Sequence, residues 1–340
     1  MLDFSNTLNL PLIWGAIILL AIAIYVILDG FDLGVGILFL FAPSEECKNK
    51  MINSIAPFWD GNETWLVLGG GVLFAAFPMA YAIISPAVYL PILFMLVALI
   101  FRGVAFEFRF KASAEYRKIW DMSFHYGSVF AAFMQGVILG SIVQGVSVDN
   151  SRFAGKAFDW LSAFSVVTGI ALVMGYALLG ATWIIMKSSA TTQNWARRVA
   201  SYLIVHVLFF MAIVCLWMPF IDDAIYARWF LWPNCLYVAV IPLVTIYVSS
   251  RLIHAIRANY EYEPFFMTIA LFMLGFLGLL ISLWPYIVPR SVTFTQAAAS
   301  PKSLSIMLVG VTIALPVILL YTGYNYYVFR GKADAASMYK

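Results

Sequence analysis

Apolar stretches of about 20 residues recur along almost the whole chain, and each is long enough to cross a hydrocarbon core about 30 Å thick. Hydrophobic residues make up 63% of the sequence and charged residues 11%, against roughly 45–50% and 25% in soluble domains. No soluble domain fits between the stretches. The sequence therefore predicts an all-α, polytopic integral membrane protein that forms one transmembrane helical domain over residues 1–340.

Polar residues, glycines and prolines divide the apolar sequence into nine predicted spans. The spans cover residues 12–41, 57–78, 80–102, 122–146, 162–186, 198–219, 229–254, 264–288 and 305–329. The first stretch is longer than one crossing needs and contains Asp29, Gly30 and Asp32, which favour an interrupted helix. The connection at 78–80 is expected to be a very tight turn.

Basic residues are distributed unevenly between the two sides of this topology. Of the 20, 15 lie in or at the edge of the loops on the C-terminal side, and the other 5 lie on the opposite side. These loops are 43–56, 102–121, 187–197, 251–263 and 330–340. The positive-inside rule therefore predicts an outside N-terminus and a cytoplasmic C-terminus. No basic segment precedes the first stretch, so we expect a retained helix and a mature chain that starts near Met1.

Several common kinds of site are not predicted. Cys47, Cys215 and Cys235 are far apart and form no CxxC pair, which argues against a disulfide framework or a zinc site. The glycines of "GFDLGVG" lie inside an apolar run without the strand-turn-helix unit of a phosphate-binding fingerprint, and no GxSxG motif occurs. A net charge of +3, widely dispersed, gives no indication of a nucleic-acid partner.

Glycines repeat at helical spacing in two of the spans. The pairs are Gly30 with Gly34 and Gly136 with Gly140. A separation of four residues places both glycines on one face of a helix, where they let a neighbouring helix backbone come close. Close helix packing is therefore their expected role, ahead of approach to a ligand.

Acidic residues enter the apolar sequence in two pairs. Asp29 and Asp32 are three residues apart, as are Asp60 and Glu63, so each pair shares one face if its segment is helical. The predicted first span ends in the cytoplasm after the first pair, and the second span begins there just before Asp60. The two pairs are therefore expected near the cytoplasmic face.

Charged residues at the end of the third span are predicted to join these acids. Arg102 stands where that span returns to the cytoplasm, and Glu107 and Arg109 follow it. An isolated carboxylate inside lipid costs at least about 2.5–3.5 kcal/mol, so the acids should face protein, water or each other. The topology thus gathers four span acids and two arginines, with Glu107 beside them, at one depth.

Two interpretations of this cluster stay open from the residues alone. One is structural: Asp60 and Arg102 form an interfacial ion pair, and Asp29 caps a broken helix. The other is a proton entry route, because neighbouring acids titrate together and pass protons through water.

The histidines and the C-terminal aromatic run are the residues that could form a haem site or a quinone pocket. His125 and His254 lie near the ends of their spans, and His206 has no second histidine clearly at its depth, so a bis-histidine haem is not expected. The aromatic run "YTGYNYYVFRGK" reads as the amphipathic cytoplasmic end of the last helix, an anchor ahead of a quinone pocket. Its residues are Tyr321, Tyr324, Tyr326 and Tyr327, followed by Arg330 and Lys332.

Five blocks of sequence closely resemble subunit II of the cytochrome bd family of quinol oxidases. They are "LDGFDLGVG" at 28–36, "MINSIAPFWDGNETWLVLGGGVLFAAFP" at 51–78, "FRGVAFEFR" at 101–109, "WPYIVP" at 284–289 and "LPVILLYTGYNYY" at 315–327. The blocks run in order from the first span to the last. The length of the chain and its short connection between the sixth and seventh spans, "PFIDDAIYAR", are similar to those of the cyanide-insensitive branch of the family.

The resemblance implies a nine-helix subunit of the bacterial cytoplasmic membrane that pairs with a similarly folded subunit I. The complex oxidises quinol and reduces oxygen to water; subunit I holds the b- and d-type haems and the quinol site, so this chain is expected to have no haem, metal or catalytic residue. Subunit II is associated with proton delivery from the cytoplasm, and the aspartate of "WDGN", here Asp60, is tied to it. Glu63 stands where other members can carry an amide.

The resemblance extends to further partners and leaves alternatives to weigh. A small single-helix accessory subunit, membrane lipid and a structural quinone are compatible with it. A stand-alone proton-coupled secondary transporter is the main alternative, since intramembrane acids and broken helices are also its signature. A purely structural partner of subunit I is the third.

Overall fold

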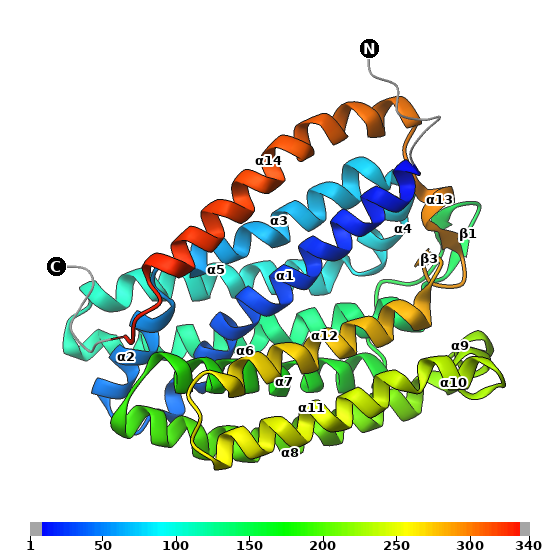
Figure 1. The fold of residues 1–340 in the computed structure, drawn as a ribbon. Coiled ribbons are helices and arrows are strands. Elements are labelled where there is room, and N and C mark those ends of the chain that lie inside the picture. The colour runs from blue at the N-terminus through cyan, green and yellow to red at the C-terminus, as the bar shows by residue number, and fades with distance from the viewer. Residues whose placement is uncertain (1–8, 334–340) are drawn as a thin grey trace.

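The computed structural model describes residues 9–333, most of which lie in helices that run alongside one another (Figure 1). The long helices are α1 (Leu10–Leu38), α3 (Trp59–Ala76), α5 (Tyr89–Lys111), α6 (Ala114–Gln144), α7 (Ala163–Lys187), α8 (Ala190–Trp217), α11 (Val240–Arg257), α12 (Glu263–Leu283) and α14 (Pro301–Val328). The shorter helices are η1 (Phe39–Phe41), α2 (Glu45–Ile55), α4 (Pro78–Ala87), η2 (Met218–Phe220), α9 (Asp223–Phe230), α10 (Asn234–Val238) and α13 (Phe294–Ala297). The expected start of the mature chain near Met1, and residues 334–340 of the last predicted loop, lie outside the described residues.

Two short antiparallel hairpins join the helices at one end of the bundle (Figure 1). β1 (Val148–Asp149) pairs with β2 (Arg152–Phe153), and β3 (Tyr286–Val288) pairs with β4 (Val292–Thr293). The short helices α9, α10 and α13 lie at this same end, whereas α2 and the C-terminal end of α14 lie at the other (Figure 1). The beginning of α1 and the end of α14 are therefore at opposite ends of the bundle.

Within residues 9–333, eight helical segments are long and apolar enough to cross a membrane. They are α1 with η1, α5, α6, α7, α8 with η2, α10 with α11, α12 and α14. α3 corresponds to the remaining predicted span and runs beside α1 (Figure 1). Its first turns carry Asp60, Asn62 and Glu63, which lower its mean hydropathy. The predicted all-α membrane fold is confirmed.

α1 is continuous, contrary to the predicted interruption. The helix begins after Asn9, whose side-chain oxygen accepts a hydrogen bond from the Leu12 amide, and stays regular past Asp29 and Asp32. Polar side chains break helices when they compete for the helix's own backbone groups. Here both carboxylates lie against partners on other helices, so the backbone bonds of α1 are left intact and the prediction of a broken helix is wrong.

The predicted tight turn at 78–80 is also wrong. α3 ends at Ala76 and a ten-residue helix, α4, carries out the reversal before α5 begins at Tyr89. Pro78 opens α4 at a position where a proline ring is tolerated because no helical N–H is needed there. α4 occupies the first part of the predicted third span, so the helix that crosses the membrane is α5. It ends at Lys111, nine residues later than predicted. Arg102 therefore lies well inside α5.

Glycines bring α7 into backbone contact with α1 and α6. A Cβ atom on Gly34 would lie 1.9 Å from the Tyr176 carbonyl oxygen and 2.7 Å from the Gly180 nitrogen. A Cβ atom on Gly136 would lie 2.5 Å from the Thr168 carbonyl oxygen. No side chain fits at these distances, so the close packing predicted for the glycine pairs is confirmed.

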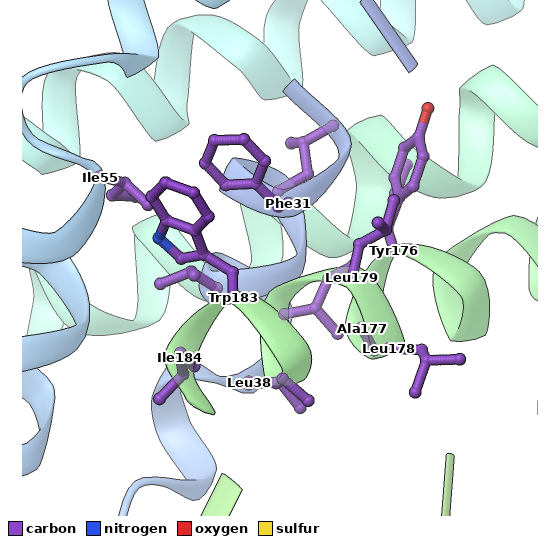
Figure 2. Close-up of a cluster of buried hydrophobic side chains, with 14 of the residues drawn as sticks. Phe31, Leu38, Ile55, Tyr176, Ala177, Leu178, Leu179, Trp183 and Ile184 are labelled. Atoms are coloured by element: carbon purple, nitrogen blue, oxygen red, sulfur yellow. The ribbon is translucent and has the colours of Figure 1, made fainter. Parts of the chain in front are cut away.

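A cluster of buried aromatic and aliphatic side chains fills the space between α1 and α7 (Figure 2). Phe31 stacks on Trp183 with ring centroids 4.0 Å apart, and Ile55 of α2 lies beside the pair. Leu38 and Ile184 continue the cluster toward the α2 end. This packing surrounds the turn of α1 that carries the two aspartates, and it fixes the positions from which their side chains extend.

Candidate functional site

Arg102 of α5 is the centre of a buried cluster of charges. Its Nη1 atom lies 3.2 Å from Asp29 Oδ1 of α1 and 2.5 Å from Glu63 Oε1 of α3. Arg102 and Asp29 are almost fully buried, whereas the Glu63 side chain is 29% exposed. Three helices therefore place one guanidinium between two carboxylates, one of which reaches the protein surface.

Asp32 extends the cluster in a second direction through Asn62. The Asn62 side-chain amide donates to Asp32 Oδ2 at 2.6 Å and lies 3.3 Å from the Leu28 carbonyl oxygen. The Tyr326 hydroxyl of α14 donates to Asn62 Oδ1 at 3.0 Å. The second oxygen of Asp32 is buried and has no hydrogen-bond partner in residues 9–333. A titratable group is thus held here with unused hydrogen-bonding capacity.

A chain of neutral polar side chains continues from Asp29 toward α6 and α7. Tyr25, one helical turn before Asp29, interacts electrostatically with its carboxylate and accepts a hydrogen bond from Gln135 Nε2 at 2.7 Å. The Tyr176 hydroxyl donates to Gln135 Oε1 at 2.9 Å. Together these groups form a polar track through an otherwise apolar part of the bundle.

Asp60 lies apart from the buried cluster, at the surface. It is exposed in the first turn of α3, where its charge is favourable near the helix N-terminus, and Glu63 follows one turn later. The ion pair between Asp60 and Arg102 that the structural interpretation requires is not formed. Glu107 is half-buried on α5 and makes no ion pair with any described residue.

Arg109 belongs to a separate network at the α2 end of the bundle. Its guanidinium lies 2.6 Å from Asp121, 2.9 Å from the Asn49 amide oxygen and 3.1 Å from Glu45. Lys48 completes the network 2.8 Å from Asp121. Partial burial acts to lower the pKa of Lys48, but its hydrogen bonds to Asp121 and Glu45 outweigh burial and raise the pKa above the ordinary lysine value. This network ties α2 to α5 and α6, and Arg109 is not a partner of Asp29, Asp32 or Glu63.

The histidines do not fit a haem-ligand pair. His125 Nδ1 lies 3.2 Å from the Gly36 carbonyl oxygen, so this ring nitrogen is bonded to the fold. His206 is exposed on α8 and bonds within its own helix, and His254 is exposed on α11. In the part of the chain that the structure describes, no group of three or more His, Cys, Asp or Glu side chains could hold a metal ion, and the three cysteines are unpaired.

Residues 10–329 match the family model described as cytochrome bd terminal oxidase subunit II. The chain belongs to this family. Cytochrome bd oxidases carry haems, and relatives of this subunit II are named as subunits of ubiquinol oxidases. Membership, together with the apolar helices, makes this subunit II a multi-pass protein of the bacterial cytoplasmic membrane and a component of an oxidoreductase.

Two relatives show how far the similarity extends. Cytochrome bd ubiquinol oxidase subunit 2 of Bacillus subtilis is 30% identical, over 95% of this subunit II and 96% of that chain. Cytochrome bd-I ubiquinol oxidase subunit 2 of Escherichia coli is 27% identical, over 95% of each chain. A chain in the structure of bd oxidase from Geobacillus thermodenitrificans has the same fold, with a TM-score of 0.78 at 14% identity, over 95% of this chain and 99% of that one.

Sequence reasoning missed the neutral members of the site. Asn62 and Tyr326 carry no charge, and hydropathy alone gives them no role. Their signal was positional: Asn62 lies between Asp60 and Glu63, and Tyr326 lies in the aromatic run assigned to an anchor. Tyr321, Tyr324 and Tyr327 are exposed as an anchor would be, whereas Tyr326 turns inward to the acids.

Proposed function

We propose that the chain pairs with a haem-bearing subunit I in a quinol:oxygen oxidoreductase, and that it delivers protons from the cytoplasm toward the oxygen-reducing haem. Family membership and the relatives' names as ubiquinol oxidase subunits support the first part. The b- and d-type haems and the quinol site are assigned to subunit I, as the family resemblance implies. The bonding of His125 Nδ1 to a carbonyl oxygen and of His206 within its own helix supports this for the haems.

The observation that carries proton delivery is a sequence of acids that leads from the surface into the bundle. Asp60 is exposed, Glu63 lies one helical turn further and is partly exposed, and Arg102 joins Glu63 to the buried Asp29. Ionisable residues inside a membrane mark proton relays in many pumps and transporters. The arginine balances part of the negative charge, so that acids can exchange protons at this depth without a large net charge inside the membrane.

The direction of delivery rests on the placement of basic residues. The α2 end of the bundle, where the acids lie, carries most of them, which supports a cytoplasmic location for this end and an outside N-terminus. We further propose that the helices act as a single domain. Lipid, a structural quinone or a single-helix accessory subunit would occupy the exposed apolar surface.

Asp60→Asn in the assembled oxidase tests the proposal. Asparagine keeps the size and hydrogen bonding of the side chain and removes the titrating proton. We expect normal haem spectra and quinol-driven oxygen consumption that is at least about tenfold slower, because a general acid or base typically contributes 10²–10⁴-fold. The spectrum also tests the pairing, since a colourless single chain after mild purification would support a transporter.

Asp223→Asn is the matched control. Asp223 is an exposed acid in the first turn of α9, at the opposite end of the bundle, so its substitution changes the charge and the helix dipole in the same way. Wild-type turnover in Asp60→Asn across the pH range would refute proton entry at this residue. An equal loss in both variants would show a general effect of removing a surface acid.

A further inference from the structure

α14 packs on the rest of the chain along one face only. One face of its middle is exposed, with Ile313 68% and Leu320 74% accessible. On the other face, Leu315 and Ile318 pack against the buried cluster that contains Tyr25 and Trp65. Near its C-terminal end, Asn325 Nδ2 donates to the Pro57 carbonyl oxygen at 2.9 Å, and one residue later the Tyr326 hydroxyl donates to Asn62 at 3.0 Å. Two adjacent side chains therefore attach this helix to the start of α3, next to the acids.

The ring of Tyr326 is held in place by aromatic neighbours. It stacks on Phe58 with ring centroids 4.3 Å apart. The rings of Phe31 and Trp183 lie nearly perpendicular to it, with centroids 6.4 and 6.3 Å away. Phe31 precedes Asp32 in α1 and belongs to the core drawn in Figure 2. Because packing fixes the ring, the hydroxyl group points at Asn62 from one direction, independently of the hydrogen bond itself.

Hydrogen bonds on both sides hold the Asn62 amide in one orientation. The Tyr326 hydroxyl donates to its oxygen, and its NH₂ group faces two acceptors, Asp32 Oδ2 and the Leu28 carbonyl oxygen. An asparagine side chain has a donor NH₂ group and an acceptor oxygen on opposite sides, and an ionised carboxylate can only accept. With its oxygen engaged by the tyrosine hydroxyl, Asn62 turns its NH₂ group toward Asp32 Oδ2, at 2.6 Å. A reversed amide would place two acceptor oxygens against each other in a buried site, unless Asp32 carried a proton.

We propose that Tyr326 is a positioning residue that holds the Asn62 amide toward Asp32 and so favours the ionised form of this carboxylate. The proton itself resides on Asp32; Tyr326 acts through Asn62 and touches no reacting group. The significance for turnover rests on the proposed proton-delivery function. The orientation of the amide and its effect on Asp32 do not depend on that proposed function.

Other groups near Asp32 also affect its titration, and the effect of the Asn62 amide has to be distinguished from theirs. The charged groups around Asp32 are Asp29 on the same helix, Glu63 on α3 and Arg102 on α5. Tyr176 of α7 lies on the Asp29 side of the cluster. Tyr326→Phe removes one oxygen atom and alters none of these charges, so a changed titration of Asp32 would report the amide.

Infrared titration of the assembled oxidase tests the proposal. The carbonyl band of protonated Asp32 is identified as the band lost in Asp32→Asn, and its midpoint is followed against pH. In Tyr326→Phe we expect the protonated form to persist to a pH about one unit higher, because a hydrogen bond to a charged group is weakened. Asn62→Ala, which deletes the donor, should shift the midpoint in the same direction.

The double variant separates positioning from a general structural effect. If the tyrosine acts only through Asn62, adding Tyr326→Phe to Asn62→Ala gives no further shift. Tyr324→Phe is the matched control, since Tyr324 is 67% exposed on the same helix, and it should titrate like the wild type. A wild-type midpoint in Tyr326→Phe, or a further shift in the double variant, overturns the proposal.

Two outcomes keep this test distinct from that of proton delivery. If Tyr326→Phe does not assemble, the Asn62→Ala protein decides, and an unshifted midpoint there overturns the inference. If the midpoint moves as expected while the pH profile of oxygen consumption does not, the positioning role stands and Asp32 is not part of the rate-limiting delivery of protons.

Discussion

Arg102 and Asp29 face each other inside the bundle, with Nη1 3.2 Å from Oδ1 and both side chains almost fully buried. The same nitrogen contacts Glu63, and Asp32 lies nearby, so one fixed positive charge serves three acids. A buried ion pair contributes little net stability when complete, but removing one partner leaves an uncompensated charge. The stability of the site and the proton delivery proposed for it would therefore depend on the same arginine.

Arg102→Gln should destabilise the assembled complex by about 3–5 kcal/mol, because it leaves buried carboxylates without a cation. Thermal loss of the haem spectrum measures the change. Adding Asp29→Asn should recover part of the loss, since it removes one of the uncompensated charges. Arg257→Gln, at an exposed position at the end of α11, is the control and should behave as wild type. Equal stability of the two single variants would contradict this account.

Asp121→Asn should lower stability by about 2–3 kcal/mol, because Arg109 and Lys48 both lose a charged acceptor. The pKa of Lys48 is raised in the folded protein, so its contribution is complete below the unfolded value, about 10.4, and is lost as the pH rises through the folded value. The gap in thermal midpoint between wild type and Asp121→Asn should therefore narrow above about pH 10.4. Glu115→Gln, an exposed acid on the same helix, should show no gap at any pH.

Gly34→Ala should lower the yield and thermal stability of the complex by about 1–3 kcal/mol or more, because the new methyl group would meet the Tyr176 carbonyl oxygen of α7. Backbone atoms cannot move aside as a flexible side chain can. Gly310→Ala is the matched control: apart from the adjoining backbone of its own helix, no atom of the described residues lies within 4 Å of the added carbon. Helix propensity favours alanine there by up to about 1 kcal/mol. If both variants are as stable as wild type, the contact between α1 and α7 is looser than the structure indicates.

His206→Ala should leave every haem absorption band in place, because this side chain is exposed on α8 and its ring nitrogen bonds the Tyr202 carbonyl oxygen of its own helix. The visible spectrum of the purified complex measures this directly. Loss of one band from a complex that still contains both large subunits would show that the chain supplies a haem ligand.

The sequence identified the membrane helices and the acids because both depend on local chemistry. Apolar length marks a span wherever it packs, and a carboxylate inside such a span needs a partner whatever the fold. The nine predicted spans therefore correspond to helices, and Asp29, Asp32, Glu63 and Arg102 do lie together. Tertiary partners could not be predicted in the same way. The integrity of α1 at Asp29 depends on Arg102, which lies 73 residues later in the chain.

Two further differences have similar causes. α4 is as apolar as its neighbours, so hydropathy alone could not separate it from α5. Arg109 follows Arg102 by seven residues and was assigned to the same cluster. It forms ion pairs with Asp121 and Glu45 instead, and so belongs to the network around α2. Which acid an arginine meets is decided by how helices are placed side by side, and the order of residues along one helix does not contain that information.

The contact between Gly34 and Gly180 limits how the acids can move. The backbones of α1 and α7 are in contact at these glycines, which opposes movement of α1 relative to α7. The carboxylates that α1 carries are therefore held on a rigid helix. Rearrangements of the two carboxylates would then come from rotation of the Asp29 and Asp32 side chains. Such local motions are far faster than shifts of whole helices. If protons pass through these acids as proposed, the stiffness of their support has its origin in two residues that lack side chains.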